Sequence, residues 1–184
     1  MPTDERGAIL LAIARAAIAR TFGLAAQADE CAPWLAEPGA TFVTLTQDGQ
    51  LRGCIGCLEA CRPLLEDIKA NACSAAFRDT RFAPLCADEF GRTCVEVSLL
   101  SPLQPIAFRD EQDALAQLRP GIDGVVLEYG YHRGTFLPQV WEQLPRPEDF
   151  LAHLKAKAGL PADFWAAGIK LYRYTVEKWK EQRS

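Results

Sequence analysis

Hydrophobic positions in the first third of the chain follow two different periods. Between residues 3 and 22 the apolar residues recur at helical spacing, and Gly23 follows at a position that suits a helix end. Residues 41–47 instead alternate β-branched and apolar side chains, which is typical of a strand. The pair Asp48-Gly49 then predicts a type I′ turn, so residues 50–55 return as the second arm of a hairpin.

The middle of the chain keeps this mixed pattern. A helix is predicted from Pro63 to about Phe77, because proline suits the first helical position. Residues 93–100 form the clearest strand of the sequence, and its apolar face is made by Val95, Val97 and Leu99. Glu96 therefore lies on the opposite, more polar face of that strand. Its carboxylate could be exposed to solvent or could lie near a functional site, and both possibilities stay open.

The second half of the chain contains further short elements. We expect an extended segment at 101–108, a helix at 110–118 and a strand at 122–129. A turn with its returning arm at 130–140, a helix at 147–159 and a last strand at 169–179 follow. There is no βαβ repeat and no glycine-rich dinucleotide fingerprint. The pattern predicts an α+β fold with mainly antiparallel sheet flanked by helices. One domain over residues 1–184 is expected, with room for a smaller second lobe.

Composition and charge narrow the classes of function. The chain has 184 residues, a net charge of -4 and a pI near 5.3, which argues against nucleic-acid binding through bulk electrostatics. No apolar run reaches the roughly 18 residues of a membrane helix. Asp4 and Glu5 precede the first apolar stretch, unlike the basic start of an export signal, so a cytoplasmic protein is expected.

Seven cysteines are present, and the odd number favours reduced thiols. Most of them are expected to be core residues, because free cysteine packs as a small hydrophobe. Cys54, Cys57 and Cys61 place three thiols within eight residues. A structural zinc site usually has four ligands, and strand alternation would put Cys54 and Cys57 on opposite faces. We therefore predict no metal and no cofactor.

The segment Leu51–Gly56 has the strongest chemical character. In an extended segment Arg52 and Cys54 would point to the same face, and a cation beside a thiol lowers the thiol pKa and favours the reactive thiolate. The flanking glycines allow close backbone approach, and N–H groups beside them could form an oxyanion site. This predicts Cys54 as a nucleophile with Arg52 as its activator.

A catalytic base is less obvious from the sequence. Only two histidines occur. His132 is expected in a turn after a strand and could reach a cleft, whereas His153 lies within a predicted helix and is expected to be structural. A Cys54–His132 pair, an unassisted thiolate and Asp79 as base all stay open.

The loop from Arg78 to Leu85 contains two arginines, one carboxylate, one aromatic residue and a proline. It either supplies arginines to the end of the preceding helix or forms an anion pocket. Together with the glycines of the hexapeptide, it also suits a binding module that captures a small anion, a nucleotide-like ligand or a peptide end, without chemistry at Cys54.

Four strings resemble the signature blocks of the AMMECR-domain family, called AmmeMemoRadiSam system protein A in bacteria and archaea. They are LRGCIG at 51–56, AAFRDTRFAPL at 75–85, TFLPQV at 135–140 and KAG at 157–159. The resemblance extends over nearly the whole chain. It implies an α+β fold with a smaller lobe, a functional LRGCIG segment beside a cleft, and an association with Memo-like and radical-SAM proteins. It implies no established biochemical activity.

Carried over residue by residue, the resemblance implies a set of site positions. These are Arg52, Gly53, Cys54, Ile55 and Gly56, then Arg78, Asp79, Arg81 and Phe82, then Leu137 and Pro138. His132 is not part of the signature, and Cys57 and Cys61 depart from the family pattern. The sequence thus predicts cleft-based thiol chemistry on a small anionic or macromolecule-linked substrate. The alternative is a non-catalytic ligand- or protein-binding module.

Overall fold

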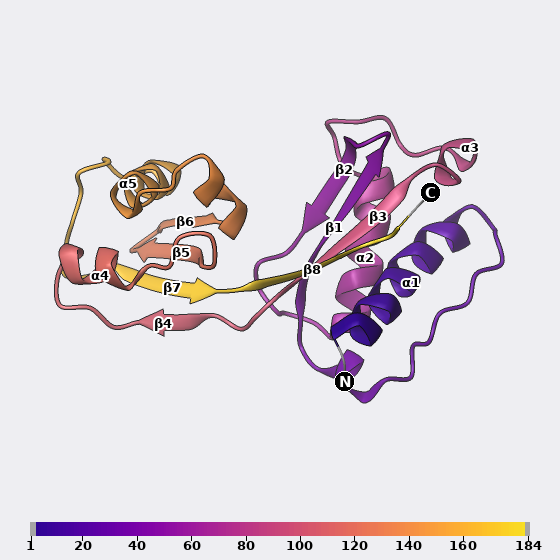
Figure 1. Ribbon diagram of the computed structural model, residues 1–184, viewed down its shortest axis with the longest axis horizontal. Helices are drawn as coiled ribbons and strands as arrows, with labels where there is room; N and C mark the ends of the chain where they lie inside the picture. The colour runs from indigo at the N-terminus through magenta and orange to yellow at the C-terminus, as the bar shows by residue number, and fades with distance from the viewer. Residues whose placement is uncertain (1–2, 183–184) are drawn as a thin grey trace. The chain divides into compact units, whose positions relative to one another are not determined.

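The computed structural model describes residues 3–182, and the chain divides into two compact units (Figure 1). The first unit takes the chain up to Leu100 together with the residues from Glu177 onward, and the second unit takes Ser101–Val176. Each unit has its own four-stranded sheet and its own hydrophobic core. The predicted α+β class with antiparallel sheets is confirmed.

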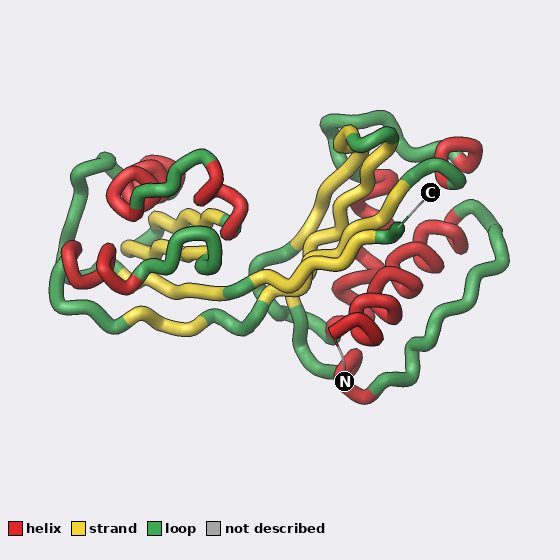
Figure 2. The backbone as a smooth tube through the Cα atoms, in the orientation of Figure 1, coloured by secondary structure: helices red, strands yellow, loops and turns green. Residues whose placement is uncertain are grey.

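The first unit packs helices against one face of its sheet (Figure 2). Its strands lie in the order β2-β1-β3-β8, so β2 is an edge strand. The elements are α1 (Thr3–Thr21), η1 (Pro33–Ala36), β1 (Ala40–Gln47), β2 (Gln50–Gly56), α2 (Leu64–Phe77), α3 (Ala87–Phe90), β3 (Cys94–Leu100) and β8 (Val176–Lys180). The short helix α3 was not predicted.

The β1–β2 hairpin has the predicted turn but an unexpected register. Asp48 and Gly49 have φ values of 50° and 77°, which confirms a turn with positive φ at both central residues. Thr46 lies opposite Leu51, whereas the next residue of β1, Leu45, lies opposite Gly53. Arg52 is therefore an extra residue in a β-bulge. The prediction of uninterrupted alternation between Arg52 and Cys54 is wrong at this bulge.

Strand β2 approaches helix α2 at Gly53. A Cβ atom at this position would lie 2.1 Å from the carbonyl oxygen of Ala75 in α2, which is far inside van der Waals contact. Leu45, opposite Gly53, is fully buried in the same core. The glycine is thus required by a strand-to-helix contact that leaves no space for a side chain.

The second unit has the strand order β4-β7-β5-β6, with all pairs antiparallel. Asp110 caps α4 as predicted, since its side chain accepts a hydrogen bond from the Asp113 N–H at 2.8 Å. The elements are β4 (Gln104–Ile106), α4 (Glu111–Gln117), β5 (Gly124–Tyr129), β6 (His132–Phe136), η2 (Pro138–Glu142), α5 (Pro147–Lys157) and β7 (Lys170–Tyr174).

Two boundaries in this half of the chain differ from prediction. The turn after β5 consists only of Gly130 and Tyr131, so His132 is the first residue of β6 and pairs with Tyr129. The predicted last strand is two strands, which belong to different sheets. They separate at Thr175, whose N–H and C=O bond to Ser101.

Between residues 3 and 182 no helix combines the length and the hydropathy that a membrane crossing requires.

The contact at Gly53 generates a stability prediction. Gly53→Ala should lower the free energy of unfolding by about 3 kcal/mol, because the methyl group meets a backbone oxygen that cannot rotate away. Gly91→Ala is the matched control, since a Cβ atom there meets nothing within 4 Å. Urea unfolding of both variants measures the difference. Equal stabilities of the two variants would contradict the close approach of β2 to α2.

Candidate functional site

Cys54 lies on the edge strand β2 and its side chain faces away from the helices. Its neighbour Gly53 faces α2, and successive side chains of a strand alternate. The Cys54 side chain is half-buried, and the Thr44 hydroxyl donates a hydrogen bond to its Sγ atom at 3.3 Å. Thr44 is therefore a side chain that hydrogen-bonds this sulfur, and a hydroxyl donor suits a sulfur that carries negative charge.

A row of three polar side chains crosses this face of the sheet. Thr44 of β1 lies opposite Cys54 of β2 on one side and opposite Glu96 of β3 on the other. Adjacent strands are about 4.8 Å apart, so the three side chains start from neighbouring backbones at about that spacing. The predicted placement of Glu96 on the polar face of β3 is confirmed, because Val95 and Val97 belong to the core on the other face.

The end of α2 holds the main chain of Cys54. The Cys54 N–H donates to Asp79 Oδ2 at 2.9 Å, and Arg81 Nη2 donates to the Cys54 carbonyl oxygen at 3.2 Å. Arg81 also binds Asp79 through Nε and Nη2, at 2.9 and 2.6 Å. The Asp79–Arg81 pair thus satisfies the groups that an edge strand normally presents to solvent. The two sequence blocks predicted to share a site do meet here.

These bonds determine the chemistry left to Asp79. The hydrogen bond from Arg81 holds the pKa of the Asp79 carboxyl well below its usual range, and the N–H groups of Cys54 and Arg81 add to this. A carboxylate with so low a pKa is a weak base, so Asp79 positions the strand instead of accepting a proton. The expectation of a free oxyanion donor is wrong for the Cys54 N–H, because Asp79 occupies that donor.

The Arg52 guanidinium forms hydrogen bonds with residues of the segment that leads into α3 and with α3 itself. Its Nε and Nη2 atoms donate to the two carboxylate oxygens of Glu89 at 3.2 and 3.0 Å, and its Nη1 atom donates to the Ala83 carbonyl at 2.9 Å. Arg52 lowers the pKa of Glu89 to about 2, with help from the Cys86 N–H. The guanidinium therefore anchors the bulge to residues 83–89, and its hydrogen bonds go there and not to the Cys54 sulfur.

The other predicted positions of the first unit have identifiable structural roles. A Cβ atom at Gly56 would lie 2.2 Å from the Phe42 ring, and Ile55 packs against the core. Arg78 is exposed at the end of α2, where its N–H donates to the Ser74 carbonyl. The Phe82 ring lies 5.5 Å from the Arg81 guanidinium.

Three predicted positions belong to the second unit. His132 Nδ1 is 3.0 Å from the Ala158 carbonyl oxygen, at the end of α5. Leu137 is the N-cap of η2 and Pro138 is its first residue, so the returning strand β6 ends at Phe136, before the predicted end of the returning arm at residue 140. His153 lies in α5, as expected, with Nδ1 2.8 Å from the Asp149 carbonyl.

The cysteines differ from expectation in their burial. All seven are free, and none is a core residue: Cys31, Cys61 and Cys86 are exposed, and the other four are partly buried. The prediction that most cysteines are packed in the core is wrong. In the part of the chain that the structure describes, no group of three or more His, Cys, Asp or Glu side chains is arranged to hold a metal ion.

Sequence reasoning missed Thr44 and Glu89. Counting outward from the Asp48-Gly49 turn places Val43 opposite Cys54, because a regular hairpin keeps one register. The bulge at Arg52 shifts the register by one residue and brings Thr44 opposite Cys54 instead. No local signal in the sequence marks that bulge. Glu89 comes from a helix of four residues that has no periodic pattern to reveal it.

Comparisons of this chain with known proteins show which family it matches. The AMMECR1 family model matches residues 11–179. Protein MJ0810 of Methanocaldococcus jannaschii is 42% identical over 140 residues, which cover 73% of this chain and 68% of that protein. A protein of Thermococcus gammatolerans is 36% identical over 193 residues, which cover 97% of this chain and 92% of the relative.

A solved structure agrees with these matches. The crystal structure of the uncharacterized protein PH0010 from Pyrococcus horikoshii superposes with a TM-score of 0.80 at 34% sequence identity, and the alignment covers 97% of this chain and 92% of that one. A family model that matches most of the chain and several relatives above 30% identity lead to the same conclusion. The chain belongs to the AMMECR1 family.

Proposed function

We propose that Cys54 acts as a nucleophile on a small anionic or macromolecule-linked substrate. The observation that carries this proposal is the hydrogen bond from the Thr44 hydroxyl to the Cys54 sulfur, on a side chain that remains partly accessible. A thiolate is the reactive form of cysteine, and a hydroxyl aimed at the sulfur offers a hydrogen bond to the negative charge that the attacking sulfur carries. The exposed Arg78 on the neighbouring loop supports an anionic substrate.

The proton of the Cys54 thiol needs an acceptor. Glu96 ends the row that begins at Cys54, and Thr44 between them both donates and accepts hydrogen bonds. In the proposal the Thr44 hydroxyl turns from the sulfur toward Glu96 and passes the thiol proton to that carboxylate. The sulfur then forms a bond to an electrophilic atom of the substrate, while the bond from that atom to its leaving group breaks and the leaving group takes up the proton held by Glu96. His132 as the base stays a prediction beside this one.

In this proposal the two charged pairs, Asp79–Arg81 and Arg52–Glu89, position the main chain around Cys54. Asp79 and Arg81 hold the main chain of Cys54 from the strand edge, and Glu89 holds Arg52 one residue before Gly53. A nucleophile on a fixed main chain loses little freedom when the substrate binds, which favours reaction. In this account Arg52 supports Cys54 through the shape of the bulge, and not by direct contact with the sulfur.

A second candidate function is a non-catalytic module that works with Memo-like and radical-SAM partners. One observation favours it: close packing alone explains the two glycines that flank Cys54, at the Ala75 carbonyl and the Phe42 ring. The hexapeptide would then be a structural element that shapes a ligand- or protein-binding surface. The two candidates differ in whether the Cys54 sulfur is unusually reactive.

The reactivity of Cys54 should depend on Thr44. Thr44→Val should slow alkylation of Cys54 at pH 7 about fivefold, because a hydrogen bond to the sulfur anion contributes about 1 kcal/mol. Thr46→Val is the matched control, since Thr46 lies on the same face of β1 but opposite Cys94. Iodoacetamide labelling with mass spectrometry of each cysteine measures the rates.

In the unsubstituted protein, Cys54 should react faster than Cys73 and Cys94, which are buried to a similar degree. Equal rates at these three cysteines, together with no effect of Thr44→Val, would remove the nucleophile proposal and favour the binding module.

The Arg52–Glu89 pair should make stability depend on pH. The pKa of Glu89 falls from 4.5 to about 2 on folding, so its contribution is complete above pH 4.5 and disappears as the pH drops toward 2. Glu89→Gln should therefore lower the free energy of unfolding by about 1 to 2 kcal/mol at pH 6, and by almost nothing near pH 2. Denaturant titrations at both pH values measure this.

The matched control is Asp88→Asn, an exposed carboxylate of the same short helix. A loss in Glu89→Gln that stays constant between pH 6 and pH 2 would show that the ion pair with Arg52 does not stabilise the bulge.

A further inference from the structure

We propose that Cys57 and Cys61 form a reversible redox pair, which closes to a disulfide within the loop that connects β2 to α2. This inference is independent of the nucleophile proposal, because neither thiol belongs to the row that contains Cys54.

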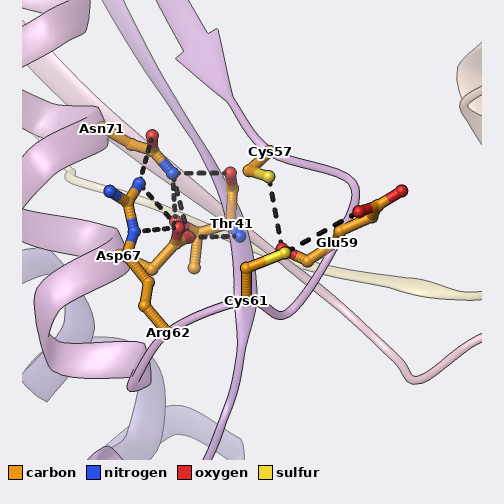
Figure 3. A network of polar contacts seen from close by, with 7 residues as sticks. All are labelled: Thr41, Cys57, Glu59, Cys61, Arg62, Asp67 and Asn71. Atoms are coloured by element: carbon orange, nitrogen blue, oxygen red, sulfur yellow. Dashed lines mark hydrogen bonds and ion pairs between the residues drawn. The ribbon is translucent and has the colours of Figure 1, made fainter.

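The two cysteines converge on one residue, Glu59 (Figure 3). The Cys57 thiol donates to the Glu59 carbonyl oxygen at 3.2 Å, and the Cys61 N–H donates to the same oxygen at 2.9 Å. The Cys61 thiol donates to the Glu59 carboxylate at 3.7 Å. Both residues thus bind the same Glu59 oxygen, and the charge of Cys57 acts on the Cys61 thiol, so the two side chains lie in one electrostatic neighbourhood.

The ends of this loop are fixed to the core of the first unit. The Cys57 N–H donates to the Thr41 carbonyl at 3.0 Å, and Arg62 binds the carboxylate of Asp67 at 2.9 Å. Asp67 is buried and accepts three hydrogen bonds at Oδ2, two from Thr41 and one from Asn71 (Figure 3). A buried carboxylate with all these donors is a rigid anchor. Ring closure therefore requires rotation of the Cys57 side chain and movement of residues 58–61, between two fixed ends.

The exposure of the two thiols and the charges around them affect how readily they are oxidised. Cys61 is exposed and Cys57 is half-buried, so an oxidant reaches at least one sulfur directly. Partial loss of hydration around the exposed thiol, then the negative charge of Glu59 and the neighbouring Cys57, raise the pKa of Cys61. The thiolate is the form that reacts, so formation of the disulfide should accelerate as the pH rises above neutrality.

The reaction balances with a peroxide as the oxidant. One thiol attacks hydrogen peroxide, becomes a sulfenic acid and releases one water. The sulfur of the second thiol then attacks the sulfenic sulfur, the S–O bond breaks, and a second water leaves with the thiol proton. The two sulfurs lose two electrons in total, and the two oxygen atoms of the peroxide gain them. A dithiol reductant reverses the reaction by exchange.

The test uses the full chain and a protease that cleaves after glutamate. Cys54, Cys57 and Cys61 share one tryptic segment, but cleavage after Glu59 separates Cys57 from Cys61. The variant Cys54→Ser, treated with stoichiometric hydrogen peroxide, should lose the mass of two hydrogen atoms. Its fragments on the two sides of Glu59 should stay joined until a dithiol reductant is added.

Two matched variants complete the experiment. In Cys54→Ser/Cys61→Ser the same one equivalent of peroxide should leave Cys57 as a sulfenic acid, which a sulfenic-acid trapping reagent labels, without a crosslink, because its partner is missing. Cys86→Ser removes a different exposed thiol and should leave the crosslink intact. The proposal is overturned if the fragments around Glu59 separate in the oxidised protein, or if Cys61 pairs with Cys31 or Cys86 instead.

Discussion

The site depends on a contact between two backbones, where Gly53 of β2 meets the carbonyl oxygen of Ala75 in α2. A Cβ atom would lie 2.1 Å from that oxygen, so only glycine lets the edge strand come this close. The consequence for Cys54 is orientation: since Gly53 faces the helix, the next side chain faces the opposite side of the sheet. Four residues after Ala75, the chain supplies Asp79, which binds the Cys54 N–H. Helix α2 and the loop that follows it therefore fix two neighbouring positions of β2.

The bulge at Arg52 determines which side chain lies beside the Cys54 sulfur. It shifts the hairpin register by one residue and so places Thr44, and not Val43, opposite Cys54. A hydroxyl beside the sulfur replaces an aliphatic side chain that would belong to the core. Arg52 itself is the extra residue, and its ion pair with Glu89 holds the bulge against the segment before β3. The arginine of the hexapeptide thus contributes to the site through backbone geometry.

Much of the fold could be predicted from local patterns, because local patterns cause it. The Asp48-Gly49 turn, the two faces of β3 and the Asp110 cap each follow from a few adjacent residues. The interruption at Thr175 could not be predicted, because the sequence from 169 to 179 alternates over most of its length and the partner strands decide where it divides. The partner of Arg52 was missed for a similar reason, since an ion pair across 37 positions has no periodic signal. The meeting of Cys54 with the Arg78–Phe82 loop could be anticipated only from the resemblance to the AMMECR-domain family.

The central claim is that Asp79 holds the main chain of Cys54 at the strand edge, and amide hydrogen exchange at single residues tests it most directly. The Cys54 amide should be protected in the unsubstituted protein, although it points away from β1. In Asp79→Ala its exchange should become at least about tenfold faster, because a hydrogen bond to a charged acceptor contributes about 1.5 to 3 kcal/mol. The Ile55 amide, opposite Val43, should keep its protection. Equal exchange of the Cys54 amide in both proteins would contradict the account.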